Sequence, residues 1–302
     1  MANNRAAIVR SVNYLKKRKY TDGFWYGLMT AASVAVGVAL VGIIAYILIQ
    51  ALGSAQQADH SNAASNAIGA EFFRIQSLLP MIVSTAWTVV VSLAIALPVG
   101  VMTAVYLHEY AAKSSISRFL GLAIDTLAGI PSIIYGLFGL LFFCRFMNLG
   151  QSIIAGGLTL SIMILPVIIR TTEEALKTVP VSFREGSLSL GATKFQTIVH
   201  VILPPALPGI LTAAILAVGR VVGESAPVLL TVGLARNLPK TIFEPGRTLT
   251  IHLYYLTKEA IEADDFAQAF TAAAVLIVVV LLINTVVKII GRSFGSSASV
   301  EE

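Results

Sequence analysis

The sequence is poor in charged residues and almost free of cysteine. Asp, Glu, Lys and Arg make up 12% of the 302 residues, whereas an average soluble domain has roughly 25%. The one cysteine, Cys144, excludes an intrachain disulfide, and no Cys/His cluster has the spacing of a metal site. The shortage of charge therefore argues against an ordinary soluble protein.

The short motifs of common catalytic and nucleotide-binding sites are also missing. The stretches "GLTLSIMIL" and "GAT" at 191–193 contain glycine but lack the Gly-Lys-Ser/Thr of a P-loop. Neither a dinucleotide fingerprint nor a catalytic-triad pattern occurs. We therefore expect a chain that is no enzyme and that itself binds no metal, cofactor or nucleic acid.

Apolar residues are abundant and gather in long runs. They form 56% of the chain, and the mean hydropathy is +0.82. A run of about 20 apolar residues is long enough to cross a bilayer as a helix. The pattern predicts an all-α polytopic helical membrane bundle with about six spans, at 24–52, 80–107, 118–146, 151–170, 207–234 and 267–291.

The first apolar run follows a basic segment and so invites comparison with a signal peptide. A signal sequence has an apolar region of only about 7–15 residues, and the run at 24–52 is much longer. We therefore expect a retained membrane helix.

The distribution of Lys and Arg predicts the orientation. Most of those outside the spans fall on the side that carries the N-terminus, and basic residues favour the cytoplasm. Both termini are then cytoplasmic, and so is the segment 171–206. The long segments 53–79 and 235–266 are then external. Segment 53–79 is expected to be weakly structured, and 235–266 to form short surface helices that serve as a packed lid or as a docking surface for an external partner.

The cytoplasmic segment contains two predicted helix starts. Ser182 and Glu185 have the spacing of a capping box, and so do Thr193 and Gln196. Gly191 is placed to end the first short helix in a left-handed conformation. The pattern predicts a short helix, a glycine break and a second helix. Such a rigid pair could be a contact site on which another protein acts; the alternative is an ordinary capped loop.

The stretch "EGSLSLGATKFQTIVHVILP" at 185–204 resembles the EAA loop of ABC importer permeases. That pattern reads E-A-A, three residues, G, nine residues, I-x-L-P, and both spacings match. The chain departs from it at Gly186, Ser187 and Val201. The resemblance implies a coupling helix that docks on a cytoplasmic ATPase subunit. The residues assigned to that contact are Ser182, Arg184, Glu185, Gly186, Ser187, Leu188, Gly191, Ala192 and Thr193.

Three further stretches are similar to the PstA-type permeases of phosphate importers: "DTLAGIPSIIYGLFGLL" at 125–141, "ILPVIIRTTEEALKTVP" at 164–180 and "GRVVGESAPVLLTVG" at 219–233. The resemblance implies a type I importer (MetI-like) permease core in a prokaryotic inner membrane. The implied partners are a PstC-type permease, two PstB-type ATPase subunits that bind ATP and Mg²⁺, and an external PstS-type phosphate-binding protein. The expected organisation is a cytoplasmic tail at 1–23, a first helix and external loop at 24–79, a permease domain at 80–291 with its coupling loop at 171–206, and a second tail at 292–302.

Two charged residues in the fifth span are candidates for the transport pathway. An arginine at the centre of a membrane costs about 2.5–3.5 kcal/mol on insertion scales, so Arg220 should face the bundle interior and have a partner. Glu224 at i+4 shares its helical face, and Gly219 and Gly223 would allow a close backbone approach. The pair is either a structural lock, or an arginine fork for an oxyanion that Glu224 holds in place. Pro227 is expected to weaken or kink the helix just beyond.

Three other polar residues receive weaker assignments. Arg170, at the cytoplasmic end of the fourth span, is either an anchor in the membrane interface or a second oxyanion contact. Asp125 is expected to bond a hydroxyl or a cation, and His252 to be a surface residue.

The function expected is therefore that of a permease subunit of an ATP-driven phosphate importer. A permease for another oxyanion, such as sulfate or molybdate, is the alternative within that class. From another class, a secondary anion transporter would need coupling carboxylates in the membrane, and only Asp125 and Glu224 qualify.

Overall fold

The computed structural model describes residues 2–57, 67–111, 114–259 and 263–295, which form helices and loops and no strand. Three stretches of these helices are π-helical and are called η. The elements are α1 (Ala2–Gln57), α2 (Ala67–Val105), η1 (Tyr106–Tyr110), α3 (Ser115–Ala128), α4 (Ser132–Gly139), η2 (Leu140–Phe146), α5 (Ile153–Lys177), α6 (Val181–Ser189), α7 (Lys194–Thr197), η3 (Ile198–Ile202), α8 (Leu203–Gly223), α9 (Ala226–Thr231), α10 (Leu249–Glu259) and α11 (Ala263–Gly295). The all-α membrane bundle expected from the sequence is confirmed.

Five helical segments among the described residues are long and apolar enough to cross a membrane. They are Asp22–Leu52, Leu78–Tyr110, Ile153–Lys177, Lys194–Gly223 and Gln268–Ile289. A sixth span forms only if the pair Ser115–Ala128 and Ser132–Phe146 is counted as one, and this pair is bent by 99°. The span expected at 118–146 is therefore present as two helices with a sharp break between them. The break falls at Pro131, whose ψ of 138° is not helical and whose ring prevents the helix from continuing.

Helix α5 forms the centre of the bundle and packs against α2 and α8. It begins at Ser152, whose hydroxyl accepts a hydrogen bond from the Ala155 amide. A Cβ on Gly157 would lie 2.4 Å from Val91 on α2, and one on Gly209 of α8 would lie 2.3 Å from Ala175. Small residues at these two crossings therefore let the helix backbones approach closely.

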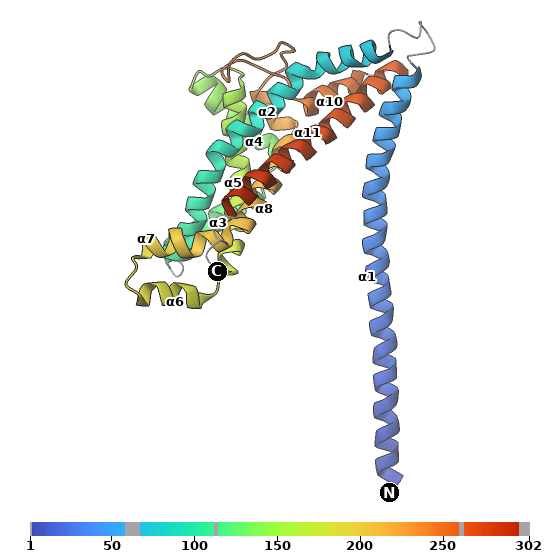
Figure 1. Ribbon diagram of the computed structural model, residues 1–302, viewed down its shortest axis with the longest axis vertical. Helices are drawn as coiled ribbons and strands as arrows, with labels where there is room; N and C mark the ends of the chain where they lie inside the picture. Colours follow the sequence, from blue (N-terminus) through green and yellow to red (C-terminus); the bar gives the residue numbers. More distant parts are fainter. Residues whose placement is uncertain (1, 58–66, 112–113, 260–262, 296–302) are drawn as a thin grey trace.

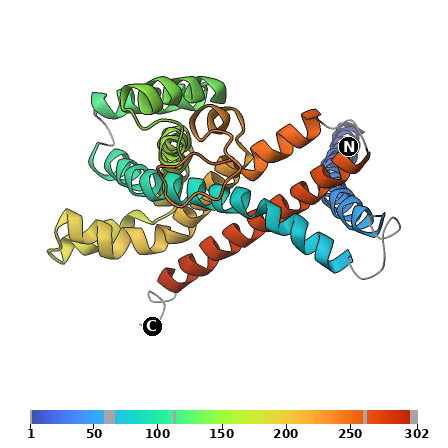
Figure 2. The same ribbon diagram turned by 90° about the horizontal axis from the view of Figure 1, so that it is seen from above.

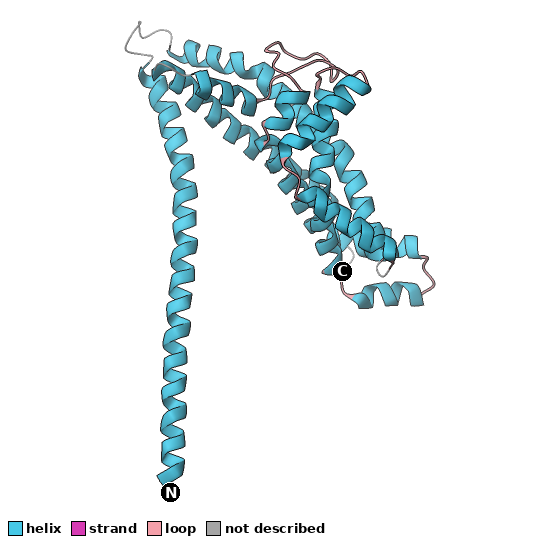
Figure 3. Cartoon of the chain, turned by 180° about the vertical axis from the view of Figure 1, so that it is seen from behind, coloured by secondary structure: helices cyan, strands magenta, loops and turns pink. Residues whose placement is uncertain are grey.

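Helix α1 diverges from the bundle along most of its length (Figures 1 and 3). It contacts the N-terminal part of α11, where the rings of Tyr46 and Phe270 meet edge to face with centroids 5.8 Å apart. The segment 1–23, expected as a tail, belongs to this continuous helix from Ala2 onward. The weakly structured loop expected at 53–79 is shorter, because α1 ends at Gln57 and α2 begins at Ala67; residues 58–66 lie outside the described residues.

The segments expected on opposite sides of the membrane lie at opposite ends of the bundle. The short helices α6 and α7 lie at one end, with the C-terminal end of α11 nearby, while the loop between α9 and α10 lies at the other (Figures 1 and 3). Viewed from above, α6 and α7 are on the side opposite α1, and α2 and α11 cross between them (Figure 2). The short helix expected in the external segment 235–266 is present as α10.

Candidate functional site

Helix α8 ends at Gly223, between the two residues expected to form a pair on one helical face. Glu224 is extended, with ψ of 133°, and its Oε1 lies 3.9 Å from Nε of Arg220. The expected pair is present, but the prediction of a continuous helix through it is wrong. Pro227 explains the break, because in a continuous helix its ring would clash with the carbonyl of Gly223.

The guanidinium of Arg220 is accessible and weakly held. The Arg220 side chain is 39% exposed and the Glu224 side chain 17%, and no residue in the described part of the chain accepts a hydrogen bond from Arg220 at normal distance. Gly219 and Gly223 were expected to permit a close backbone approach, and a Cβ at either position would meet nothing within 4 Å in the described chain. No described helix of this chain uses that room: Arg220 and both glycines lie on an open face of α8.

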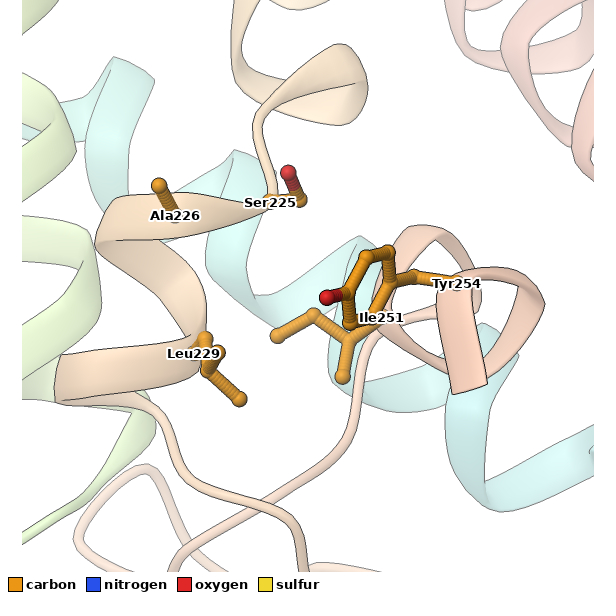
Figure 4. A pocket seen from close by; sticks show the side chains of 5 residues that line it. All are labelled: Ser225, Ala226, Leu229, Ile251 and Tyr254. Carbon is orange, nitrogen blue, oxygen red and sulfur yellow. The ribbon is translucent and has the colours of Figure 1, made fainter. Parts of the chain in front are cut away.

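A small cavity of about 160 Å³ lies beside the break, between α9 and α10 (Figure 4). Its lining is mostly apolar and consists of Ser225, Ala226, Leu229, Ile251 and Tyr254. The Tyr254 hydroxyl points into the space between the two helices (Figure 4). The hydroxyl of Thr250 donates to the carbonyl of Val222 and so ties α10 to the end of α8. No sequence pattern predicted this cavity, because its two walls are more than twenty residues apart.

Arg170 is fully engaged by other residues of the chain. Its Nε and Nη2 donate to Asp125 Oδ1 at 3.0 and 2.7 Å, Nη1 donates to Glu173 at 2.7 Å, and Nη2 also donates to the carbonyl of Gly121. Asp125 therefore bonds a cation, as expected. Two carboxylates around one guanidinium leave no positive charge for an anion, so the geometry favours a structural link between α3 and α5 over a second oxyanion contact.

The cytoplasmic segment of the sequence prediction forms two short helices with a glycine break. Gly191 has φ of +88°, and the amides of Gly191 and Ala192 donate to the carbonyls of Leu188 and Ser187. This is the Schellman arrangement that ends a helix. The expected glycine C-cap is confirmed, and so is the capping box of Thr193 and Gln196.

The expected capping box at Ser182 is wrong. Helix α6 begins one residue earlier, at Val181, with Pro180 as its N-cap and no side-chain cap. Helix α7 is also not separate from the fifth span, because the helical path continues from Lys194 to Gly223. The π-helical turn η3 is separated by one residue from Pro204 and Pro205, which have no N–H and so leave helix carbonyls without a donor.

Two of the residues assigned to the ATPase contact face the bundle instead. Arg184 Nε donates to Glu109 Oε1 at 3.0 Å, and its terminal nitrogens donate to the carbonyls of Leu176 and Val179. The hydroxyls of Ser187 and Thr197 are 2.9 Å apart. Arg184 thus fixes α6 to η1, which continues α2, and to the end of α5, and Ser187 fixes it to α7. Sequence reasoning missed Glu109, although an acidic residue at the end of an apolar run was a signal that could have found it.

The other assigned residues face outward or are partly covered. Ser182, Glu185, Gly186, Leu188, Gly191 and Thr193 are exposed, and Ala192 is half-buried. Large apolar side chains accompany them, and Leu190 is 91% exposed. Helix α6 has no buried residue, so this chain leaves an apolar surface with one carboxylate, Glu185, at the end of the bundle.

The comparison with known proteins agrees with this architecture. Residues 96–299 match the family described as binding-protein-dependent transport system inner membrane component, and the chain belongs to this family. It is 33% identical to the probable ABC transporter permease protein YqgI of Bacillus subtilis, over 91% of this chain and 96% of that protein. It is 39% identical to the phosphate transport system permease protein PstA 1 of Mycobacterium tuberculosis H37Rv, over 64% of this chain and 63% of that protein.

A chain from an inward-facing crystal form of the MetNI methionine ABC transporter has the same fold. The TM-score is 0.58 and the identity 25%, over 75% of this chain and 98% of that chain. The chain is therefore a membrane-integral permease subunit of an ABC importer with a MetI-like fold, and its resemblance to PstA-type permeases is confirmed. Permeases of this class work with ATPase and substrate-binding partners.

Proposed function

We propose that this chain is the PstA-type permease of an inorganic phosphate importer, and that Arg220 contacts the transported anion. The observation that carries the proposal is that Arg220 lies at the end of a spanning helix, at an open face, without a hydrogen-bonded partner in the described chain. A guanidinium fork matches the oxygens of a phosphate. Glu224, at 3.9 Å, holds the side chain in place and reduces its affinity for the anion in the empty pathway.

The open face of α8 also supports a heterodimer. An arginine in a membrane span should not face lipid, yet Arg220, Gly219 and Gly223 are uncovered in this chain. A second, PstC-type permease subunit would cover the face and enclose a pathway between the two chains. Glycines at positions 219 and 223 leave room for both the partner helix and the anion.

The exposed surface of α6 supports the expected coupling to a cytoplasmic ATPase. Glu185 and Leu188 would contact the ATPase, while Arg184 transmits the movement of α6 to α2 and α5. Two PstB-type subunits would bind ATP and Mg²⁺, and an external PstS-type protein would deliver phosphate at the end that carries α10. Both termini are then cytoplasmic, and the helices rock between outward- and inward-open states around the site.

A secondary transporter is set aside, because the chain belongs to a family of ABC importer permeases. A permease for sulfate or molybdate is the remaining alternative. The relatives that are named for phosphate transport favour phosphate.

The test is uptake by the complete complex in proteoliposomes, with the binding protein outside and ATP inside. Arg220→Gln should lower phosphate uptake by about ten-fold or more, because a hydrogen bond to a charged group contributes about 1.5–3 kcal/mol. Lys177→Gln is the matched control, since the ion pair of Lys177 in the described part of the chain is with Glu174, an exposed residue. Normal phosphate uptake by an assembled Arg220→Gln complex overturns the role of Arg220, and import of sulfate without import of phosphate overturns the substrate.

A further inference from the structure

A second arginine, Arg247, is buried at the other end of the molecule from α6. It directly precedes α10 and is 4% exposed. Its Nε is shut off from solvent and has no hydrogen-bond acceptor in the described residues. Its guanidinium carbon lies 4.8 Å from the centre of the Tyr255 ring, which is a stacking contact and supplies no hydrogen bond.

His252 lies on the first turn of α10, close to this arginine. The Nδ1 atom of its ring is also buried without a partner among the described residues. The residue as a whole is half-buried, so the expectation of a surface histidine is confirmed only in part. Burial, and then the charges of Arg247 and Arg236, lower the pKa of His252 to about 4. The ring is neutral at pH 7 and has one nitrogen that donates and one that accepts.

The surroundings of Arg247 are short of negative charge. No carboxylate forms an ion pair with it in the part of the chain that is described, Arg236 repels it, and Glu259 attracts it only at longer range. A buried charge without a hydrogen-bonded partner is strongly unfavourable. A small anion with several acceptor oxygens would satisfy both Arg247 and His252.

Two hydrogen bonds hold the start of α10, near Arg247 and His252, beside α8. The Leu249 amide donates to the hydroxyl of Thr85 on α2 at 3.0 Å, and Thr250 is bonded to the carbonyl of Val222. The start of α10 is thereby fixed next to the end of α8, where Val222 is two residues from Arg220. The Arg247–His252 pair therefore lies beyond the end of the spanning helix that carries Arg220.

We propose that Arg247 and His252 form an outer oxyanion site, which the transported anion occupies before it reaches Arg220. The proposal rests on the function proposed above and adds a second site to it. Tyr255 orients the guanidinium by stacking, and Thr248, which caps α10 through the Ile251 amide, holds the start of the helix. A carboxylate of the external binding protein has the same chemistry. The depth of Arg247 beneath the surface favours a small ion over a side chain of a docked protein.

The experiment uses the complete permease–ATPase complex in nanodiscs without binding protein, with Arg220→Gln as the background. Sodium phosphate is titrated against sodium chloride at matched ionic strength, and the thermal unfolding midpoint is followed. We expect phosphate to raise the midpoint in this background. Adding Arg247→Gln should weaken the apparent affinity by about ten-fold or more, because hydrogen bonds from a charged donor are lost. Adding Arg236→Gln, which removes an exposed charge nearby, is the control and should have little effect.

A second variant, Arg247→Lys, is used if the complex with Arg247→Gln does not assemble. Lysine keeps the positive charge but lacks the two-pronged guanidinium, so we expect an intermediate loss of phosphate affinity. Unchanged affinity in whichever of the two variants assembles overturns the proposal. In a parallel measurement with the binding protein added, a variant that keeps its affinity for phosphate and loses only its affinity for that protein also overturns the proposal, since this would identify a protein carboxylate as the ligand. If the wild-type complex imports sulfate and not phosphate, the proposed substrate fails, and the outer site is tested by the same titration with sulfate.

Discussion

Arg184 of the short helix α6 donates to Glu109 of η1, the turn that continues α2, with Nε and Oε1 3.0 Å apart. Both side chains are largely buried, and the same guanidinium reaches the carbonyls of Leu176, in the last turn of α5, and of Val179 just beyond it. One side chain thus joins α6 to two spanning helices. This linkage explains how a helix with no buried residue holds a fixed position; under the proposed function it would also pass a movement of α6 to the bundle.

Replacing Arg184 with Gln should therefore uncouple transport from ATP hydrolysis. The carboxylate of Glu109 would be left buried without its partner, which destabilises the attachment of α6 by about 1–3 kcal/mol. We expect the ATPase activity to continue while phosphate uptake per ATP falls several-fold, measured together in proteoliposomes. Combined with Glu109→Gln, the loss should be smaller than the sum of the two single effects. Strict additivity would show that the ion pair does not transmit force.

Gly191 should resist substitution because its φ of +88° is unfavourable for residues with a Cβ. Gly191→Ala is expected to cost about 1–2 kcal/mol at the end of α6 and to weaken association with the ATPase, measured by co-purification. Gly37→Ala is the control, since Gly37 lies inside α1, away from the assigned ATPase contact, with nothing within 4 Å of an added Cβ. That change should be neutral or favour the helix. Equal effects of the two substitutions would contradict the assigned role of the Gly191 turn.

The close contact between α4 and α9 at Gly136 leads to a third prediction. A Cβ on Gly136 would lie 2.8 Å from the Cα of Pro227, so the backbones would have to separate. Gly136→Ala should destabilise the protein by about 1–3 kcal/mol through overpacking and lower the midpoint of thermal unfolding. Gly219→Ala has open space around it in this chain and should leave the midpoint of the isolated subunit unchanged. If Gly219→Ala instead blocks assembly with the second permease, the open face of α8 is the subunit interface.

The pKa of His252 predicts how stability depends on pH. Because burial lowers this pKa to about 4 in the folded protein, while an unfolded histidine has a pKa of about 6.5, the unfolded state takes up a proton first as the pH falls. His252 should then reduce stability progressively between about pH 6.5 and pH 4. We expect the wild-type midpoint to fall more than that of His252→Gln between pH 7 and pH 5. A larger fall in the variant would contradict a neutral, buried ring.

Local signals were sufficient for several features of this protein. Apolar runs predicted the spanning helices, and the glycine at position 191 and the capping box at Thr193 were identified correctly. These features depend on residues within a few positions of one another, and their geometry follows from backbone sterics and local hydrogen bonds.

Position-specific errors arose where local rules compete. Ser182 had the spacing of a cap, but α6 already begins at Val181, with Pro180 as its N-cap. Pro227 was expected to weaken or kink its helix, yet the complete end of α8 at Gly223, like the 99° bend at Pro131, depends on how the following segments pack.

By itself, the sequence determined that this chain is a polytopic helical membrane protein with an EAA-like segment, because hydropathy and short spacings are properties of neighbouring residues. Only the tertiary structure decided which charges are free. Arg170 and Arg184 are taken up by Asp125 and Glu109, which lie 45 and 75 positions away, while Arg220 and Arg247 lack such partners in the described chain. Ion pairs between distant residues depend on helix packing, and no local pattern records which helices will meet.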